Sequence, residues 1–401
     1  MHVSPHERLP RYEVYDAEDR MVVGINTHES ATITWKWGAE PGTGTLALPG
    51  TPDPELWRLA LNVHNSPLFV SVYTPMPLPW TGRVTNSEFV DDGDGPVLEL
   101  TLVDDKVWAD AMMLVPNPAQ PAGLQDRLAD VRTGPLANVI KSYLADAAAR
   151  LRVPVVVVPP DQNDPSPVVT FEARMDKASD LFGPALDEYG YGIVAYTYRY
   201  GDNLPLGMAF TPDVGTVILD VVPGRDTGTL LWQQEHLQSF SVSSSEPEAY
   251  RAYVGLDGSG EDRTYMEVVD TEARDRANGK GLPEMFVDAP TATGDGPQPE
   301  SPRAHALRTL RGTGGLSVEF TVADGQPWLA GDEWRIGDMA YTRIGGSMFS
   351  ARIAEVTMTD SADNPMVFTP VCGAVSLSRP EAVADAVASL VADIKSRDAR
   401  R

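Results

Sequence analysis

The feature that most constrains the fold is a series of short alternating runs in residues 334–373, separated by turn residues. Apolar side chains at every second position, with polar side chains between them, are typical of strands that bury one face. The apolar set is Ala354, Val356 and Met358. Gly345-Gly346 and the residues 360–365 supply the hairpin turns. The sequence therefore predicts a barrel of antiparallel strands near the end of the chain.

The same pattern appears near the N-terminus. Apolar residues alternate there in two stretches, and the sets are Ile33, Trp35 and Trp37, and Leu98, Leu100 and Leu102. Residues 68–73 and 80–84 read as further strands, and residues 91–95 as a tight turn. Two β-rich regions without an internal repeat thus predict two barrels of a similar kind.

Between these regions the pattern changes to helical spacing. Prolines in residues 114–123 predict a linker, and Thr133 and Pro135 predict a capped helix that runs to about Leu151. Residues 153–160 read as a short buried strand. A second helix is expected from Asp176, with Pro184 kinking or breaking it, followed by a strand.

That strand carries Val194, Tyr196, Tyr198 and Tyr200, which alternation would place on one face. A row of aromatic side chains serves either as cross-strand packing or as a platform for a sugar or peptide. Both interpretations stay open, and packing is the commoner one.

Composition indicates a folded protein with several domains, because 42% of the 401 residues are hydrophobic. No apolar run is long enough to predict a membrane span or a signal peptide, which leads us to expect synthesis in a cytoplasm. The single cysteine, Cys372, excludes an internal disulfide and is expected to be buried.

The formal net charge of −25 argues against stable nucleic-acid binding, which needs clustered Lys and Arg. Acidity would suit either a soluble outer surface or the wall of a channel that must not bind passing DNA. Candidates for such a wall are Glu99, Asp104, Glu333 and Glu355.

No catalytic, cofactor or metal site is predicted. The histidines are dispersed, at positions His2, His6, His28, His64, His236 and His305. Residues 91–94 lack the ligands that complete a calcium loop, and residues 257–262 lack the glycine and lysine of nucleotide-binding loops. Asp104 and Asp105 would point in opposite directions on a strand, which weakens a glycosidase interpretation. We therefore expect that the protein is not an enzyme.

These observations predict a β-rich α+β protein with two barrel domains, an α+β insertion between them and a C-terminal helix. The expected divisions are residues 1–115 for the first barrel, 116–232 for the insertion, 233–310 for connecting strands, 311–377 for the second barrel and 378–401 for the helix. A capping box at Ser378 and Glu381, ahead of an apolar stripe, predicts the last of these.

The order of these features resembles the tail-tip hub proteins, also called minor tail or baseplate hub proteins, of long-tailed bacteriophages. The matching segments include GTGTLALP, WTGRV and LELTLVDD in the first region, GPLANVIKSYLADAAARL in the insertion, and EWRIGDMAYTR, ARIAEVTMTD and FTPVCG in the last. Pro184 departs from the regular helix that such proteins usually keep.

The resemblance implies a homotrimer in the virion, at the tail tip, with two barrels per chain in a ring around the DNA channel. It implies contacts with the distal tail protein, with other tail-tip or fibre proteins and with the tape-measure protein. It also implies that the protein meets DNA only in transit. The alternative class is a glycan-binding module that uses Tyr196, Tyr198 and Tyr200.

Overall fold

The computed structural model describes residues 9–50, 53–91, 93, 95–205, 207–246, 248–256, 263–276, 278, 280, 284–288, 302–312, 315–322, 328–361 and 366–373. The chain divides into two compact units. Unit 1 comprises residues 1–230, 322–339 and 352–372, and unit 2 comprises residues 231–321, 340–351 and 373–401. The predicted helix at 378–401, the loop at 257–262, His2 and His6 lie outside the described residues.

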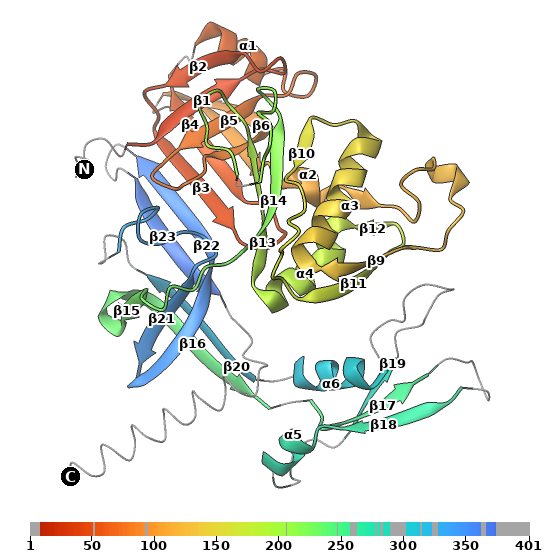
Figure 1. Cartoon of the computed structure of the whole chain (residues 1–401). Coiled ribbons are helices and arrows are strands. Elements are labelled where there is room, and N and C mark those ends of the chain that lie inside the picture. The colour runs from red at the N-terminus through yellow and green to blue at the C-terminus, as the bar shows by residue number, and fades with distance from the viewer. Residues whose placement is uncertain are drawn as a thin grey trace, which may run out of the picture. The chain divides into compact units, whose positions relative to one another are not determined.

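A large antiparallel sheet forms the first layer of unit 1 (Figure 1). Its order is β2 (Met21–Ile25), β1 (Arg11–Tyr15), β5 (Phe69–Tyr73), β6 (Trp80–Asp91), β7 (Pro96–Asp104), β4 (Thr43–Pro49), β3 (Ser30–Lys36), β22 (Ser347–Ser361) and β23 (Val367–Gly373), and the short helix α1 (Pro54–Ala60) connects β4 with β5. The pairings described for this unit follow an open path. The β-rich class is thus confirmed, whereas the two closed barrels stay a prediction.

Alternation in these strands produces the core of the sheet. Leu98, Leu100 and Leu102 are all buried, as predicted from their spacing in β7. The tight turn after β6 is also confirmed, since the backbone N–H of Gly93 donates to the Asp91 carboxylate over 3.1 Å. Cys372 is fully buried in β23, and burial raises the pKa of its thiol.

The predicted alternation in β22 is wrong at one position. Val356 and Met358 are fully buried, but so are Ala351 and Ile353, and Ala354 is only half-buried. The buried positions therefore change parity between residues 353 and 356. The backbone explains the change. The carbonyl of Ile353 accepts from the N–H of Gly337, and the carbonyl of Ala354 accepts from the N–H of Trp37, so both bond to loop residues. Regular pairing of β22 with β3 starts only at Glu355.

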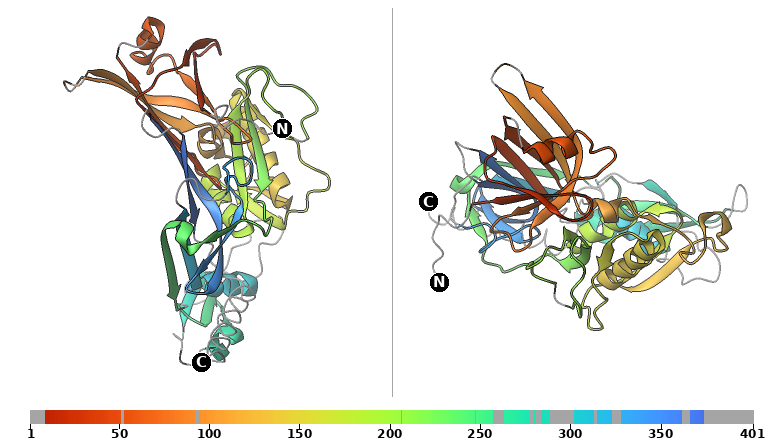
Figure 2. Two further views of the ribbon diagram at one scale, coloured as in Figure 1. Left: turned by 90° about the vertical axis from the view of Figure 1, so that its left-hand side faces the viewer. Right: turned by 90° about the horizontal axis from the view of Figure 1, so that it is seen from above.

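A helical layer completes unit 1. The strands β10 (Val155–Val157), β14 (Val217–Pro223) and β13 (Tyr191–Thr197) form a small mixed sheet, packed by α3 (Leu136–Leu151) and α4 (Ala178–Tyr189) (Figures 1 and 2). Smaller elements beside them are α2 (Val107–Asp110), β8 (Met113–Leu114), the 3-10 helix η2 (Ala122–Leu124), β9 (Asp130–Pro135), β11 (Val168–Ala173) and β12 (Asp176–Lys177). The apolar stripe of α3 is buried as predicted, including Leu136, Ile140 and Leu144.

One prediction about these helices is wrong, and one of two alternatives is excluded. Thr133 does not cap α3; it lies in β9, where its hydroxyl contacts the Thr170 hydroxyl of β11 at 2.9 Å. Pro184 does not break α4, which continues through it to Tyr189. Both Pro184 and Asp180, whose carbonyl loses its i+4 donor, are exposed, so water can hydrate that carbonyl.

Unit 2 contains two groups of strands. In the first, β15 (Leu231–Gln233) pairs in parallel with β21 (Met339–Ile344), and β16 (Leu237–Ser245) neighbours β20 (Gly315–Val322). The 3-10 helix η3 (Gln234–His236) precedes β16. The second group is β18 (Tyr265–Val269), β17 (Arg251–Gly255) and β19 (Met285–Asp288), with helices α5 (Thr271–Arg276) and α6 (Pro302–Gly312). Gly345 and Gly346 form the predicted turn between β21 and β22, each with positive φ.

Within the described part of the chain, no helix is both long enough and apolar enough to cross a membrane.

Candidate functional site

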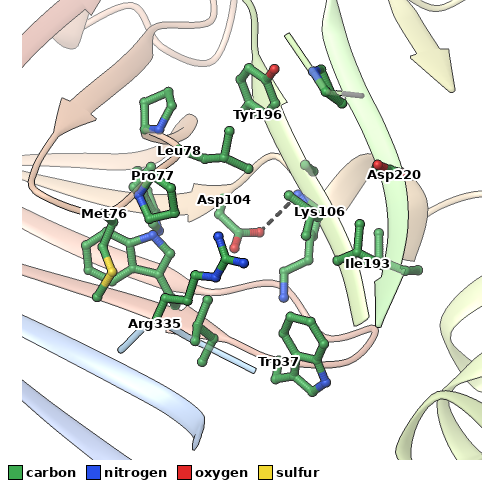
Figure 3. Close-up of a pocket in the computed structure, with 18 of the residues that line it drawn as sticks. Trp37, Met76, Pro77, Leu78, Asp104, Lys106, Ile193, Tyr196, Asp220 and Arg335 are labelled. Carbon is green, nitrogen blue, oxygen red and sulfur yellow. Dashed lines mark hydrogen bonds between the residues drawn. The ribbon is translucent and has the colours of Figure 1, made fainter. Parts of the chain in front are cut away.

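A cavity of about 400 Å³ lies inside unit 1. Its walls come from the connection between β5 and β6, the strands β13 and β14, and the residues that follow β3 (Figure 3). Most side chains around it are apolar, including Met76, Leu78, Ile193 and Trp37. Lys106 and Arg335 bring positive charge to its lining, and Asp104 and Asp220 bring negative charge.

The local sequence fixes these walls. Prolines at positions 75, 77 and 79 fix φ at three positions between β5 and β6, where the chain bends at residues 75–78, and they remove backbone donors that would otherwise need partners. Trp80 then begins β6, where its buried indole N–H donates to the carbonyl of Thr34 over 3.2 Å. The indole of Trp37 packs against Gly192 and Gly337, which have no side chains to obstruct it.

A buried carboxylate and a buried amine, those of Asp104 and Lys106, line the cavity. One oxygen of Asp104 accepts from the backbone N–H of Gly42 (2.8 Å) and the other from that of Lys106 (3.0 Å; Figure 3). The Lys106 ammonium donates to the carbonyl of Lys36. Burial raises the pKa of Asp104 to about 6 and lowers the pKa of Lys106, since both charged forms lose hydration.

The raised pKa of Asp104 predicts a specific pH dependence. Between the unfolded pKa of about 4 and the folded value of about 6, the folded state binds more protons, so its stability falls as pH rises through this window. We expect the unfolding free energy of the wild type to fall by about 2 kcal/mol more than that of Asp104→Asn between pH 4 and 7. Denaturant titrations at several pH values measure this difference, and equal slopes for the two proteins would contradict it.

Asp105 links two layers of unit 1. Its carboxylate is almost fully buried and accepts from the hydroxyls of Thr81 in β6 and Thr197 in β13, each over 2.5 Å. The Thr81 hydroxyl in turn accepts from the backbone N–H of Thr197 (2.7 Å). Burial raises the pKa of Asp105, and the hydrogen bonds from Thr197 and Thr81 oppose that shift.

Arginines hold the other side of the cavity. Arg225 makes two parallel bonds to the Asp338 carboxylate, over 2.7 and 2.5 Å, and the backbone N–H of Arg335 donates to the same carboxylate over 3.0 Å. Arg352 donates to the carbonyl of Gly337 over 2.6 Å. Bidentate Arg–carboxylate pairs fix geometry as well as charge. The polar groups here therefore fasten the loop that follows Trp334.

This arrangement suits a structural role better than a chemical one. The carboxylates of Asp104 and Asp338 accept from backbone N–H groups, and that of Asp105 accepts from two threonine hydroxyls that join β6 to β13. Among the described residues, no three His, Cys, Asp or Glu side chains are grouped as a metal would require. The expectation that the protein is not an enzyme stays a prediction.

The predicted aromatic row is divided. Tyr196 is buried in the cavity wall, and its hydroxyl donates to the carbonyl of Asn203 over 2.6 Å. Tyr198 is also buried, whereas Tyr200 is 94% exposed. The prediction that all share a face is wrong, because β13 ends at Thr197 and the chain turns after it. A glycan platform made of these three tyrosines is thereby excluded.

Sequence reasoning missed Lys106, Arg225, Arg335 and the partners of Asp105. The only local signal was the consecutive run Asp104-Asp105-Lys106 at the end of an alternating strand, where charged residues follow a buried one. Asp104 is also wrong as a channel-wall candidate, since it is 6% exposed and bonded to backbone.

Comparison with known proteins agrees with this structure. The family model of the Siphovirus ReqiPepy6 Gp37-like protein matches residues 11–374. A tail protein from Neisseria meningitidis MC58 shares the fold with a TM-score of 0.51, at 11% identity over 91% of this chain and 96% of that one. The prophage tail protein gp18 from Listeria monocytogenes EGD-e has a TM-score of 0.49, at 12% identity over 96% of this chain and 99% of that one. No curated protein matches the sequence.

The family match defines a protein of the siphoviruses, which are long-tailed bacteriophages, and the fold is shared with a solved tail protein; both agree with the resemblance seen in the sequence. The chain belongs to the Siphovirus ReqiPepy6 Gp37-like protein family.

Proposed function

We propose that the protein forms a trimeric hub at the tip of the phage tail, continues the tail channel for DNA and anchors the proteins that contact the host. The observation that carries this proposal is the family match over residues 11–374. The barrel, insertion and helix divisions given above, at residues 115, 232, 310 and 377, belong to the same proposal. Assembly would take place in the host cytoplasm.

The open sheet of unit 1 supports a ring. Among the described residues, β2 pairs with β1 alone and leaves its other edge free, where Met21 is 60% exposed. Exposed strand edges are templates for pairing with another chain unless something covers them. Cyclic symmetry would cover each such edge with the same neighbouring surface and close the ring.

The acidic residues support a channel that DNA passes without binding. Glu99 and Glu333 are exposed and Glu355 is partly exposed, so their carboxylates stay available to repel phosphate. The distal tail protein, the tape-measure protein and the fibre proteins are the proposed neighbours. Hydrolysis of the host wall is then assigned to another tail protein.

The oligomeric state tests the proposal. Light scattering should give three times the 43.4 kDa mass of one chain, and electron cryomicroscopy should show three-fold symmetry with carboxylates on the lumen. A stable monomer or a dimer, both alone and mixed with the distal tail protein, would contradict the trimer. A lumen that is uniformly basic would contradict the channel.

A further inference from the structure

The small sheet of unit 2 has one buried face and one face whose described side chains reach solvent. On the buried face, apolar residues of β17, β18 and β19 pack against α6, and this cluster contains Ala252, Val254, Val268, Val287, Ala306 and Leu310. Because side chains alternate along a strand, the residues between them project from the opposite face. The three strands pair in the order β18–β17–β19, so β17 lies in the middle of the sheet.

Three aromatic rings lie on this open face. Tyr253 is 36% exposed, Tyr265 is 60% exposed and Phe286 is 52% exposed. In the register, Tyr253 lies opposite Phe286, and Tyr265 lies opposite Gly255. Adjacent strands are about 5 Å apart, yet the rings of Tyr265 and Phe286, two strands apart, have centroids only 6.4 Å from each other. They approach above Gly255, which has no side chain to separate them.

Arg263 fills the space above that glycine. A Cβ on Gly255 would lie 2.4 Å from the guanidinium of Arg263. The guanidinium carbon lies 5.4 Å from the centre of the Phe286 ring and 6.0 Å from that of Tyr265, within reach of a cation–π interaction. Its other contacts are an ion pair with Asp288 and a bond of 3.3 Å to the carbonyl of Leu256. The two rings are therefore held in place in the absence of any ligand.

Fixed polar groups border the rings. Arg251 lies 3.3 Å from the carboxylate of Glu267 and 3.7 Å from that of Glu284. The Tyr253 hydroxyl donates to Glu284 over 3.2 Å. These side chains are paired with one another and still reach solvent, since 47% of Glu267 and 49% of Glu284 is exposed. They offer hydrogen bonds to a ligand at defined positions.

We propose that this face binds a neutral saccharide, such as a chain of the host cell surface. A pyranose ring has apolar C–H faces, which stack on aromatic rings, and a rim of hydroxyls, which suit carboxylates and guanidinium groups. Aromatic side chains that are held in place before binding lose little conformational entropy when the apolar face of a sugar stacks on them.

Charge and solvation favour this occupant over the others. Among the described residues, the face carries three carboxylates (Glu267, Glu284, Asp288) and two guanidinium groups (Arg251, Arg263), which leaves one excess negative charge on a chain of net charge −25. Nucleic acid and other polyanions would be repelled. An apolar protein partner would have to desolvate the Arg263–Asp288 pair beside the rings, which is costly, whereas the hydroxyls of a saccharide can replace the water around it.

Binding of the full-length protein to an array of neutral oligosaccharides, followed by calorimetry on the strongest one, tests the proposal. We expect Tyr265→Ala and Phe286→Ala each to weaken binding about tenfold, from the loss of a stacking surface. Tyr200→Ala, which removes an exposed tyrosine from unit 1, is the matched control and should leave affinity unchanged. Circular dichroism confirms that each variant is folded.

Three results would overturn the proposal. The first is that no neutral oligosaccharide binds, or that only acidic ones do. The second is that Tyr200→Ala weakens binding as much as Tyr265→Ala. The third is that Tyr265→Ala leaves saccharide binding intact but lowers the mass of the assembly, which would make the face an interface between copies of the chain. A monomeric wild type that still binds saccharide would contradict the trimeric hub and leave this proposal standing.

Discussion

Gly337→Ala should lower the unfolding free energy by about 3 kcal/mol, from two effects that act together. Gly337 has φ of +84°, and a side chain in such a left-handed conformation costs roughly 1–2 kcal/mol. A Cβ there would also lie 2.3 Å from the indole of Trp37, a contact far shorter than van der Waals distance. Overpacking of this kind costs typically about 1–3 kcal/mol. The shift of the urea unfolding midpoint measures the sum.

A matched glycine separates the two effects. Gly50 has φ of +71°, but a Cβ there would meet nothing within 4 Å. Gly50→Ala should therefore show only the backbone cost of roughly 1–2 kcal/mol. The double variant Trp37→Leu/Gly337→Ala should lose less stability than the sum of its single variants, since a smaller side chain leaves room for the new methyl group. Additive losses would show that Trp37 does not cause the excess.

The prediction depends on a contact that no sequence pattern contains. Trp37 was predicted as the last inward residue of an alternating strand, and alternation correctly gave buried Ile33. The strand β3, however, ends at Lys36, and the indole of Trp37 packs between Gly192 and Gly337, which are far away along the chain. Periodicity describes one strand at a time and cannot show which distant glycines receive a ring.

The same limit explains the errors in β22 and α4. A strand pattern assumes continuous pairing, and β22 changes parity where Ile353 bonds to a loop instead of a neighbouring strand. A proline rule describes an isolated helix, and Pro184 is tolerated because its side of α4 is exposed. By contrast, the helix α3 and the strand β7 were predicted well, since a strong amphipathic period determines which face each one buries.

Sequence patterns predicted the general character of the candidate site but not the residues that form it. The absence of a local catalytic motif led to the interpretation of a structural protein, and the order of segments led to the family. The burial of Asp104 and Asp105 was not predictable, because adjacent carboxylates after a strand are usually solvated. Their partners, among them Gly42 and Thr197, come from other elements brought there by tertiary structure.

Asp105→Ala should be among the most destabilising single changes in unit 1, with a loss of about 3 kcal/mol. Both threonine hydroxyls donate to the same carboxylate oxygen, and removing it leaves two buried donors without an acceptor, each costing about 1–3 kcal/mol. The gain from no longer burying a carboxylate offsets part of this cost, which is why the total is less than the full sum. Unfolding by denaturant at pH 7 measures the loss.

Asp105→Asn is the matched control, because its single carbonyl oxygen can occupy the position that both Thr81 and Thr197 need. Since burial raises the pKa of Asp105, a neutral side chain of the same shape should be tolerated with a loss below about 1 kcal/mol. If Asn and Ala variants lost equal stability, the charge of Asp105 and not its hydrogen bonds would hold the layers together. If neither lost any, the link between β6 and β13 would be dispensable. The expected order, with Ala well below Asn, assigns the joint between the large sheet and β13 to one oxygen atom.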